Sequence, residues 1–180
     1  MRFAIAAFLF AAIASAQNQT VNPLIATSKA IFNISKRDVM GSVETIPEDL
    51  WSFQPTKDVR TFGQLFAHIA DGQYEFCGVA SEGKALDKNI EKTAKSRAEV
   101  MAALKEAFAY CDSAYNGLTD AKAPEMVKFM GMSITRLGAM DFNSAHNMEH
   151  YGNLVTYMRL KGIVPPSSEP RKAPAASSKQ

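Results

Sequence analysis

The segment that begins at Ser96 constrains the fold of this chain more than any other. Ser96 and Glu99 form a capping box, in which each side chain accepts a hydrogen bond from the other residue's backbone N–H at the start of a helix. Large apolar residues follow at spacings of three and four, which places them on one face of an α-helix. They are Met101, Leu104, Phe108, Cys111 and Tyr115. A helix with one apolar stripe has to bury it against other elements, so the pattern predicts a helical domain.

Three further segments show helical signals. A helix is expected over about 22–41, because an asparagine N-cap is followed by proline at the first helical position and a glycine closes the segment. Its apolar residues are Leu24, Ile31, Ile34 and Val39. A second capping box, Thr61 with Gln64, starts a helix that runs to about residue 81. The last helix is expected over about 133–161, where glycine and two prolines follow.

The connection at 124–132 has no clear period and is compatible with a short extended piece. No series of strands is evident elsewhere in the sequence. Four amphipathic helices without such a series predict an all-α four-helix bundle.

Both ends of the chain differ in composition from this body. Residues 1–16 combine an early arginine, an uncharged apolar stretch and an Ala-Ser-Ala cleavage site, which predicts a secretory signal peptide. The stretch is shorter than the roughly 20 residues of a membrane span, so we expect cleavage and no stable membrane insertion. The mature protein would be periplasmic or extracellular. Residues 165–180 lack large apolar side chains and predict a disordered tail, which leaves 17–164 as the folded domain.

The charge of the chain argues against a nucleic-acid partner. The sequence has 20 Lys and Arg against 18 Asp and Glu, a formal net charge of +2 over 180 residues. Charges of one sign do not cluster into a long block. Because proteins hold nucleic acid through a concentrated basic surface, we expect a small-molecule ligand or substrate instead.

The three histidines carry the clearest chemical signal. His146 and His150 are four residues apart on the predicted last helix, so their Cβ atoms lie about 6 Å apart on one face. His68, on the predicted second helix, can supply a third nitrogen from a facing helix. A lone histidine is more often a surface residue or a satisfied polar group of the core. One shared ion, however, would satisfy all three rings, so the set predicts a divalent transition-metal site with positions open for water or substrate.

Polar residues near these histidines are candidates for supporting the ligands or contacting a substrate, although each is also compatible with ordinary helix polarity. They are Gln64, Asp71, Asn143 and Asn153. Glu149 completes an H-x-x-E-H motif with the histidine pair, the inverted signature of zinc peptidases. That signature needs a downstream carboxylate ligand, and the only acid after His150 is Glu169 in the predicted tail. We therefore interpret Glu149 as a helix-surface charge.

The body of the chain, about 21–164, resembles the DinB/YfiT-like superfamily of four-helix bundles. The resemblance rests on a Trp- and Pro-containing loop before a histidine in the second helix, and on an H-x-x-x-H motif in the last helix. Here these elements are Trp51, Pro55, Gln64-Leu65-Phe66-Ala67-His68, His146-Asn147-Met148-Glu149-His150 and the run Tyr157 to Gly162.

The resemblance implies an up-down-down-up helix order and a divalent metal held by His68, His146 and His150. Zinc is the ion we expect, with nickel as the alternative. Members of known activity are thiol-dependent S-transferases and a maleylpyruvate isomerase that use intracellular thiols, which an exported protein would not meet in quantity. A homodimer is left open.

Cys77 and Cys111 lie at corresponding depths of the second and third predicted helices. If these helices are parallel, as the family order implies, the two cysteines are level and can form a disulfide, which export would favour. In an antiparallel hairpin they would be about 16 Å apart along the axis, too far for a bond. Two buried free thiols are the alternative.

Two classes of function remain open. The first is a metal-dependent enzyme of hydrolase or transferase type, in which the ion polarises a substrate or activates water. The second is a non-catalytic protein that binds a metal or a small ligand at the same site. A deep apolar pocket that opens onto the free coordination positions would favour the enzyme, since a structural site lacks one.

Overall fold

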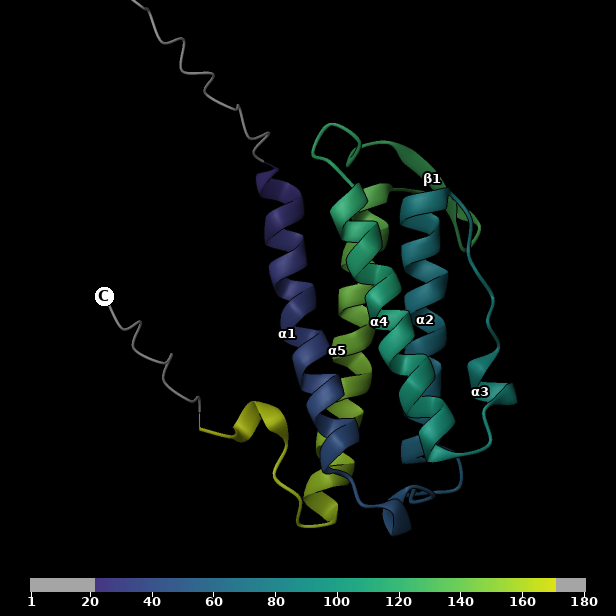
Figure 1. Ribbon diagram of the computed structural model, residues 1–180, viewed down its shortest axis with the longest axis vertical. Helices are drawn as coiled ribbons and strands as arrows, with labels where there is room; N and C mark the ends of the chain where they lie inside the picture. Colours follow the sequence, from purple (N-terminus) through teal and green to yellow (C-terminus); the bar gives the residue numbers. More distant parts are fainter. Residues whose placement is uncertain (1–21, 171–180) are drawn as a thin grey trace, which may run out of the picture.

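The computed structural model describes residues 22–170, and four long helices make up most of this part of the chain (Figure 1). They are α1 (Pro23–Thr45), α2 (Phe62–Glu82), α4 (Arg97–Gly117) and α5 (Arg136–Leu160). In Figure 1, α1 and α5 begin at the upper end of the molecule, whereas α2 and α4 begin at the lower end. Helix α2 packs against both α4 and α5, and α5 also packs against α1. The predicted mainly helical fold is confirmed, while the predicted signal peptide lies outside the described residues.

Shorter elements connect the long helices. They are the 3-10 helix η1 (Glu48–Leu50), the short helix α3 (Ile90–Thr93) and an antiparallel hairpin of β1 (Met126–Phe129) and β2 (Met132–Thr135). The hairpin shows that the predicted helix start at about residue 133 was wrong. Pairing with β1 keeps residues 132–135 extended, and the Thr135 hydroxyl then accepts a hydrogen bond from the Gly138 N–H at 3.0 Å. This cap starts α5 at Arg136.

Both predicted capping boxes are present, at Thr61 with Gln64 and at Ser96 with Glu99. The stripe of α4 faces the core, although Met101 is only partly buried. Helix α2 is buried over most of its length, because it packs against α4 on one side and α5 on the other. This central position holds the backbone around His68 firmly in place.

The buried face of α1 differs from the predicted one. Leu24, Ile31 and Ile34 are 55%, 51% and 47% exposed. Val39 is buried as predicted, and the core also receives Ile25, Phe32 and Val43, with Ser28, Ser35 and Ser42 buried between them. These small serines lie on the same face and bond to nearby groups, for example Ser42 to a carbonyl one turn earlier. Helix α1 therefore carries apolar residues on two faces, and its packing against α5 determines which face is buried.

Cys77 and Cys111 form a disulfide between α2 and α4, with their Cα atoms 5.4 Å apart. Both cysteines are fully buried. The bond requires the two residues to lie level, which agrees with the common direction of α2 and α4 in Figure 1.

Residues 165–170 of the predicted tail are described by the structure, while 171–180 are not. A 3-10 helix, η2 (Pro166–Ser168), packs against α1. The Tyr151 hydroxyl donates to the Ser167 hydroxyl at 2.7 Å and accepts from the Ser167 N–H at 3.0 Å. The described chain therefore continues past Pro165 as a packed segment.

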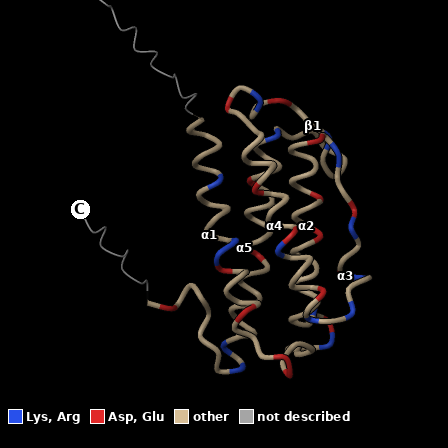
Figure 2. The backbone as a smooth tube through the Cα atoms, viewed as in Figure 1, with Lys and Arg blue, Asp and Glu red and all other residues tan. Residues whose placement is uncertain are grey.

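Basic and acidic residues are interspersed along the described chain (Figure 2). Among the described helices, none has the length and apolar character that would let it cross a membrane.

Candidate metal centre

Three imidazoles meet where α2 packs against α5. His68 projects from the first half of α2, and His146 and His150 project from successive turns of α5. The His146 Nε2 atom is 3.2 Å from His68 Nε2 and 3.1 Å from His150 Nε2. The structure therefore brings together all three of the predicted ligands.

The separations suit a common metal ion. At a zinc–nitrogen bond length of about 2.0–2.1 Å, two nitrogens on one ion lie about 2.9 Å apart at a right angle and about 3.3 Å apart at a tetrahedral angle. The two Nε2 separations at His146, 3.1 and 3.2 Å, fall inside this range. One ring nitrogen from each histidine can therefore face the same point.

Hydrogen bonds alone account poorly for this cluster. The Nε2 atom of a neutral imidazole either donates one proton or accepts one along a single direction in the ring plane. His146 Nε2 has two such neighbours within hydrogen-bonding distance, so it cannot align with both. A cation at the centre would satisfy the three lone pairs together.

The surroundings of the three histidines favour the neutral form of each imidazole ring. Burial, with the neighbouring rings contributing, lowers the pKa of His146 from 6.5 to about 3. Burial likewise lowers the pKa of His150 to about 4 and lowers the pKa of His68. All three imidazoles are therefore neutral at pH 7, and neutral imidazole is the form that coordinates a metal.

The far sides of the rings have different surroundings. His68 Nδ1 is 3.2 Å from the Glu91 carboxylate, which also accepts from the Arg60 guanidinium at 2.8 Å. The Nδ1 atoms of His146 and His150 are buried without a hydrogen-bond partner among the described residues. Packing holds the His146 ring instead, since it lies against the backbone of Gly72 and has an edge contact with Phe76.

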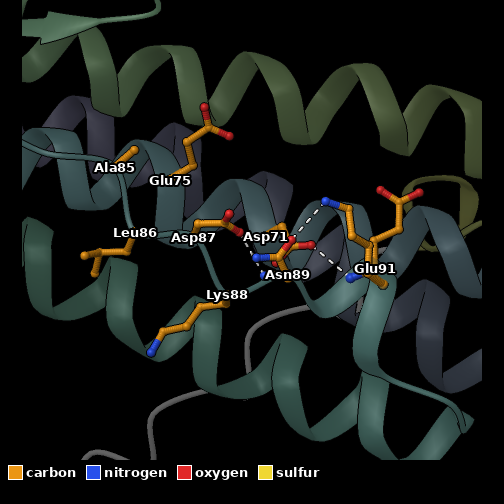
Figure 3. Close-up of a pocket in the computed structure, with 9 residues that line it drawn as sticks. Asp71, Glu75, Ala85, Leu86, Asp87, Lys88, Asn89 and Glu91 are labelled. Atoms are coloured by element: carbon orange, nitrogen blue, oxygen red, sulfur yellow. Dashed lines mark hydrogen bonds between the residues drawn. The ribbon is translucent and has the colours of Figure 1, made fainter.

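Of the four predicted supporting residues, two hydrogen-bond to groups other than the histidines. The Asp71 carboxylate accepts from the backbone N–H of Ile90 at 2.8 Å. It also accepts from the N–H of Glu91 at 2.9 Å (Figure 3). Asn143 is fully buried, and its amide donates to Gln73 at 2.9 Å beside the disulfide sulfurs. The position of Asn143 on α5 turns it into the core, where Gln73 pairs with it, and it does not line the cleft.

The other two, Gln64 and Asn153, line a cleft of about 640 Å³ that reaches His150. Gln64 also caps α2, so its side chain oxygen is engaged by the Thr61 N–H at 2.9 Å. Charged and polar side chains dominate the lining, and the rest of it consists of Gln54, Lys57, Asp58, Val59, Arg60, Leu65, Glu91, Glu149 and Tyr157. The histidine cluster is thus open to a polar cleft and not to a deep apolar pocket.

Sequence reasoning missed Glu91 and Arg60. Glu91 lies in the polar connection between α2 and α4, where no period or motif distinguishes one charged residue from the next. Gly72 was also missed, although a glycine inside a helical pattern can indicate close approach of another group.

A family model described as the DinB superfamily matches residues 32–154. The chain belongs to the DinB superfamily. No curated protein shows a significant match.

Solved structures show the same fold. A DinB-like protein from Bacillus subtilis is 20% identical, with a TM-score of 0.66 over 81% of this chain and 99% of that one. A DinB-like protein from Bacillus cereus is 14% identical, with a TM-score of 0.67 over 79% and 95%. A mutant of the mycothiol-dependent maleylpyruvate isomerase is 12% identical, with a TM-score of 0.61 over 72% of this chain and 60% of that one. At these identities the likeness concerns the fold alone.

Proposed function

We propose that this protein is an exported, divalent-metal-dependent enzyme of hydrolase or transferase type, with His68, His146 and His150 as the metal ligands. The observation that carries the proposal is the convergence of three neutral imidazoles at the end of an open polar cleft. Zinc is the ion we propose, because three neutral nitrogens with further positions open to solvent suit it. The up-down-down-up helix order of the superfamily is part of the proposal.

In this proposal the protein residues bind and orient the reactants. A bound divalent ion would supply Lewis acidity, which polarises a substrate or lowers the pKa of bound water. The cleft carries both basic side chains, Lys57 and Arg60, and acidic ones, and Gln64 and Asn153 add hydrogen-bonding groups. Such a lining favours a polar substrate. The isomerase that shares the fold supports an enzymatic function for the scaffold.

The alternative is a non-catalytic protein that binds a metal or a small ligand. Two observations favour it. The cleft beside the histidines is polar and is not the deep apolar pocket expected of an enzyme. The Glu91 carboxylate, which is in contact with His68, is already paired with Arg60. A carboxylate held in this way is a poor general base. Turnover of any substrate by the metal-loaded protein, lost on chelation, would decide for the enzyme.

Export is the second part of the proposal. It is supported by the composition of residues 1–16 and by the Cys77–Cys111 disulfide, which is typical of oxidising compartments. Mass spectrometry of the exported fraction should find a chain that starts at Gln17. Soluble protein that retains Met1 would contradict export with cleavage.

The metal site is tested by elemental analysis of the purified protein and of histidine variants. We expect about one divalent ion per chain in the wild type. His150→Ala should lose most of it, and the His68→Ala/His150→Ala double variant should lose all of it. Glu149→Gln is the matched control, since it removes a charge beside His150 without removing a ligand. Stoichiometric metal in the double variant would overturn the site. A hydrolase and transferase screen of the loaded protein then tests catalysis.

A further inference from the structure

We propose that Glu91 is a positioning residue of the metal centre, which fixes His68 in the tautomer whose Nε2 lone pair faces the other two histidines. The inference rests on the proposed function, since it concerns the same three ligands. Glu91 belongs to α3, a short helix in the connection between α2 and α4, and not to either helix that carries a histidine.

The contact itself sets the tautomer. Glu91 Oε2 is 3.2 Å from His68 Nδ1, and both side chains are 27% exposed. An ionised carboxylate only accepts hydrogen bonds, so the proton of the neutral ring has to sit on Nδ1. The Nε2 atom then carries the lone pair, and this atom is the one that lies 3.2 Å from His146 Nε2.

The Glu91 carboxylate is held in place from two directions. Arg60 donates to it from Nε at 2.8 Å and from a terminal nitrogen at 3.4 Å. Its backbone is fixed by Asp71, which accepts from the N–H of Glu91 (Figure 3) and from that of Ile90. Asp71 lies one turn after His68 on α2, so the segment that carries Glu91 is anchored to the same helix as His68. Asp71 therefore acts on His68 through Glu91.

The other two ligands have no carboxylate partner of this kind among the described residues. His146 and His150 have no hydrogen-bond partner for Nδ1 among the described residues, and packing in the bundle orients them. His68 is the ring whose orientation depends on a polar contact. Partners of this kind typically change metal affinity by about 10- to 100-fold when they are removed.

The first test needs no metal. Nitrogen-15 NMR of the apo protein at pH 8, where His68 is neutral, reports which ring nitrogen carries the proton. We expect the Nδ1–H tautomer of His68 in the wild type and in Glu91→Gln, because the glutamine amide oxygen can still accept from Nδ1. Glu91→Ala should shift His68 towards the Nε2–H tautomer. An unchanged tautomer in Glu91→Ala would overturn the proposal.

The second test measures zinc affinity by competition with a chelator. Glu91→Ala should bind zinc about 10- to 100-fold more weakly than the wild type, and Glu91→Gln should recover part of the loss. Glu149→Gln, which removes a charge beside His150 and leaves the Glu91 contact with His68 in place, should weaken zinc binding less than Glu91→Ala does. Equal losses in Glu91→Gln and Glu149→Gln would indicate a general charge effect and refute positioning.

Asp71 provides an internal check. Asp71→Ala should weaken zinc binding less than Glu91→Ala, and the double variant should bind no more weakly than Glu91→Ala alone, because Asp71 acts only through Glu91. Losses of zinc affinity that add up in the double variant would contradict the inference that Asp71 acts through Glu91. Thermal unfolding of each apo variant identifies any that fail to fold, in which case Glu91→Gln and the NMR measurement carry the test.

The two proposals fail in different ways. A wild-type protein that does not bind zinc removes the proposed function. Zinc binding by the wild type that Glu91→Ala leaves unchanged removes only the positioning of His68.

Discussion

Gly72→Ala should weaken metal binding while leaving the fold intact. Gly72 is in the interior of α2, where the His146 ring lies against its backbone. A Cβ atom at this position would be 2.7 Å from His146 Cε1 and 3.0 Å from its Nδ1 atom. The new methyl group would therefore push directly against a metal ligand.

The size of the displacement decides the outcome. The 2.7 Å approach has to grow to at least 3.4 Å to become an ordinary contact, and Phe76 limits movement of the new methyl group at 3.3 Å. Metal–ligand distances tolerate about 0.2 Å. The ring therefore has to move by several times the tolerance of the site, and we expect zinc affinity to fall at least about 10-fold.

Stability should respond much less. Alanine is favoured over glycine in a helix by about 1 kcal/mol, whereas overpacking a buried site costs about 1–3 kcal/mol. The two effects oppose each other, so we expect the free energy of unfolding of the apo protein to fall by no more than about 2 kcal/mol. Urea unfolding with chelator present measures this quantity.

Gly152→Ala is the matched control. Gly152 lies inside α5, two residues after His150, and a Cβ atom there meets nothing within 4 Å. This variant should gain about 1 kcal/mol from helix propensity and bind zinc as the wild type does. Wild-type zinc affinity in Gly72→Ala would refute the reasoning, because the two substitutions differ only in what the new methyl group meets.

Three further predictions concern stability. His146 and His150 have pKa values of about 3 and 4 in the folded state against 6.5 when unfolded, so the unfolded apo protein takes up more protons as pH falls. The free energy of unfolding should therefore be highest above pH 6.5 and decline between pH 6.5 and 4, by up to about 1.4 kcal/mol per pH unit for each histidine. Urea unfolding at a series of pH values measures this decline. Reduction of the Cys77–Cys111 disulfide, whose cysteines are 34 residues apart, should destabilise the protein by about 4 kcal/mol; two reactive thiols in unfolded, unreduced protein would contradict the bond. Asn143→Ala should cost about 1–3 kcal/mol, because its glutamine partner on α2 loses a buried hydrogen bond, yet leave zinc affinity unchanged; a selective loss of zinc would return Asn143 to the site.

Local signals in the sequence were sufficient for most of the helices. The capping boxes at Thr61 and Ser96 depend on residues three positions apart, so they can be recognised without knowledge of the fold. The spacing of His146 and His150 is equally local, since four residues make about one turn of any α-helix. These features are properties of a short stretch of backbone and persist in any bundle that contains it.

Features that depend on a second element could not be predicted in the same way. The exposed side of α1 follows from where α5 packs, because α1 carries apolar residues on two faces and the sequence alone does not say which one is buried. The start of α5 depends on pairing between β1 and β2. In both cases the competing local pattern was plausible, and the tertiary contact decided between two alternatives of similar local energy.

The features of the metal site also separate into those set by one helix and those set by contacts between elements. The sequence by itself determined that two histidines share a face of one helix and that a third lies on another helix. Only the tertiary structure determined that Glu91 meets His68, that Asn143 turns into the core, and that Gly72 leaves room for the His146 ring. Helical periodicity fixes the direction of a side chain relative to its own helix axis, whereas contacts between helices depend on the distance and rotation of a second axis, which bundle packing sets.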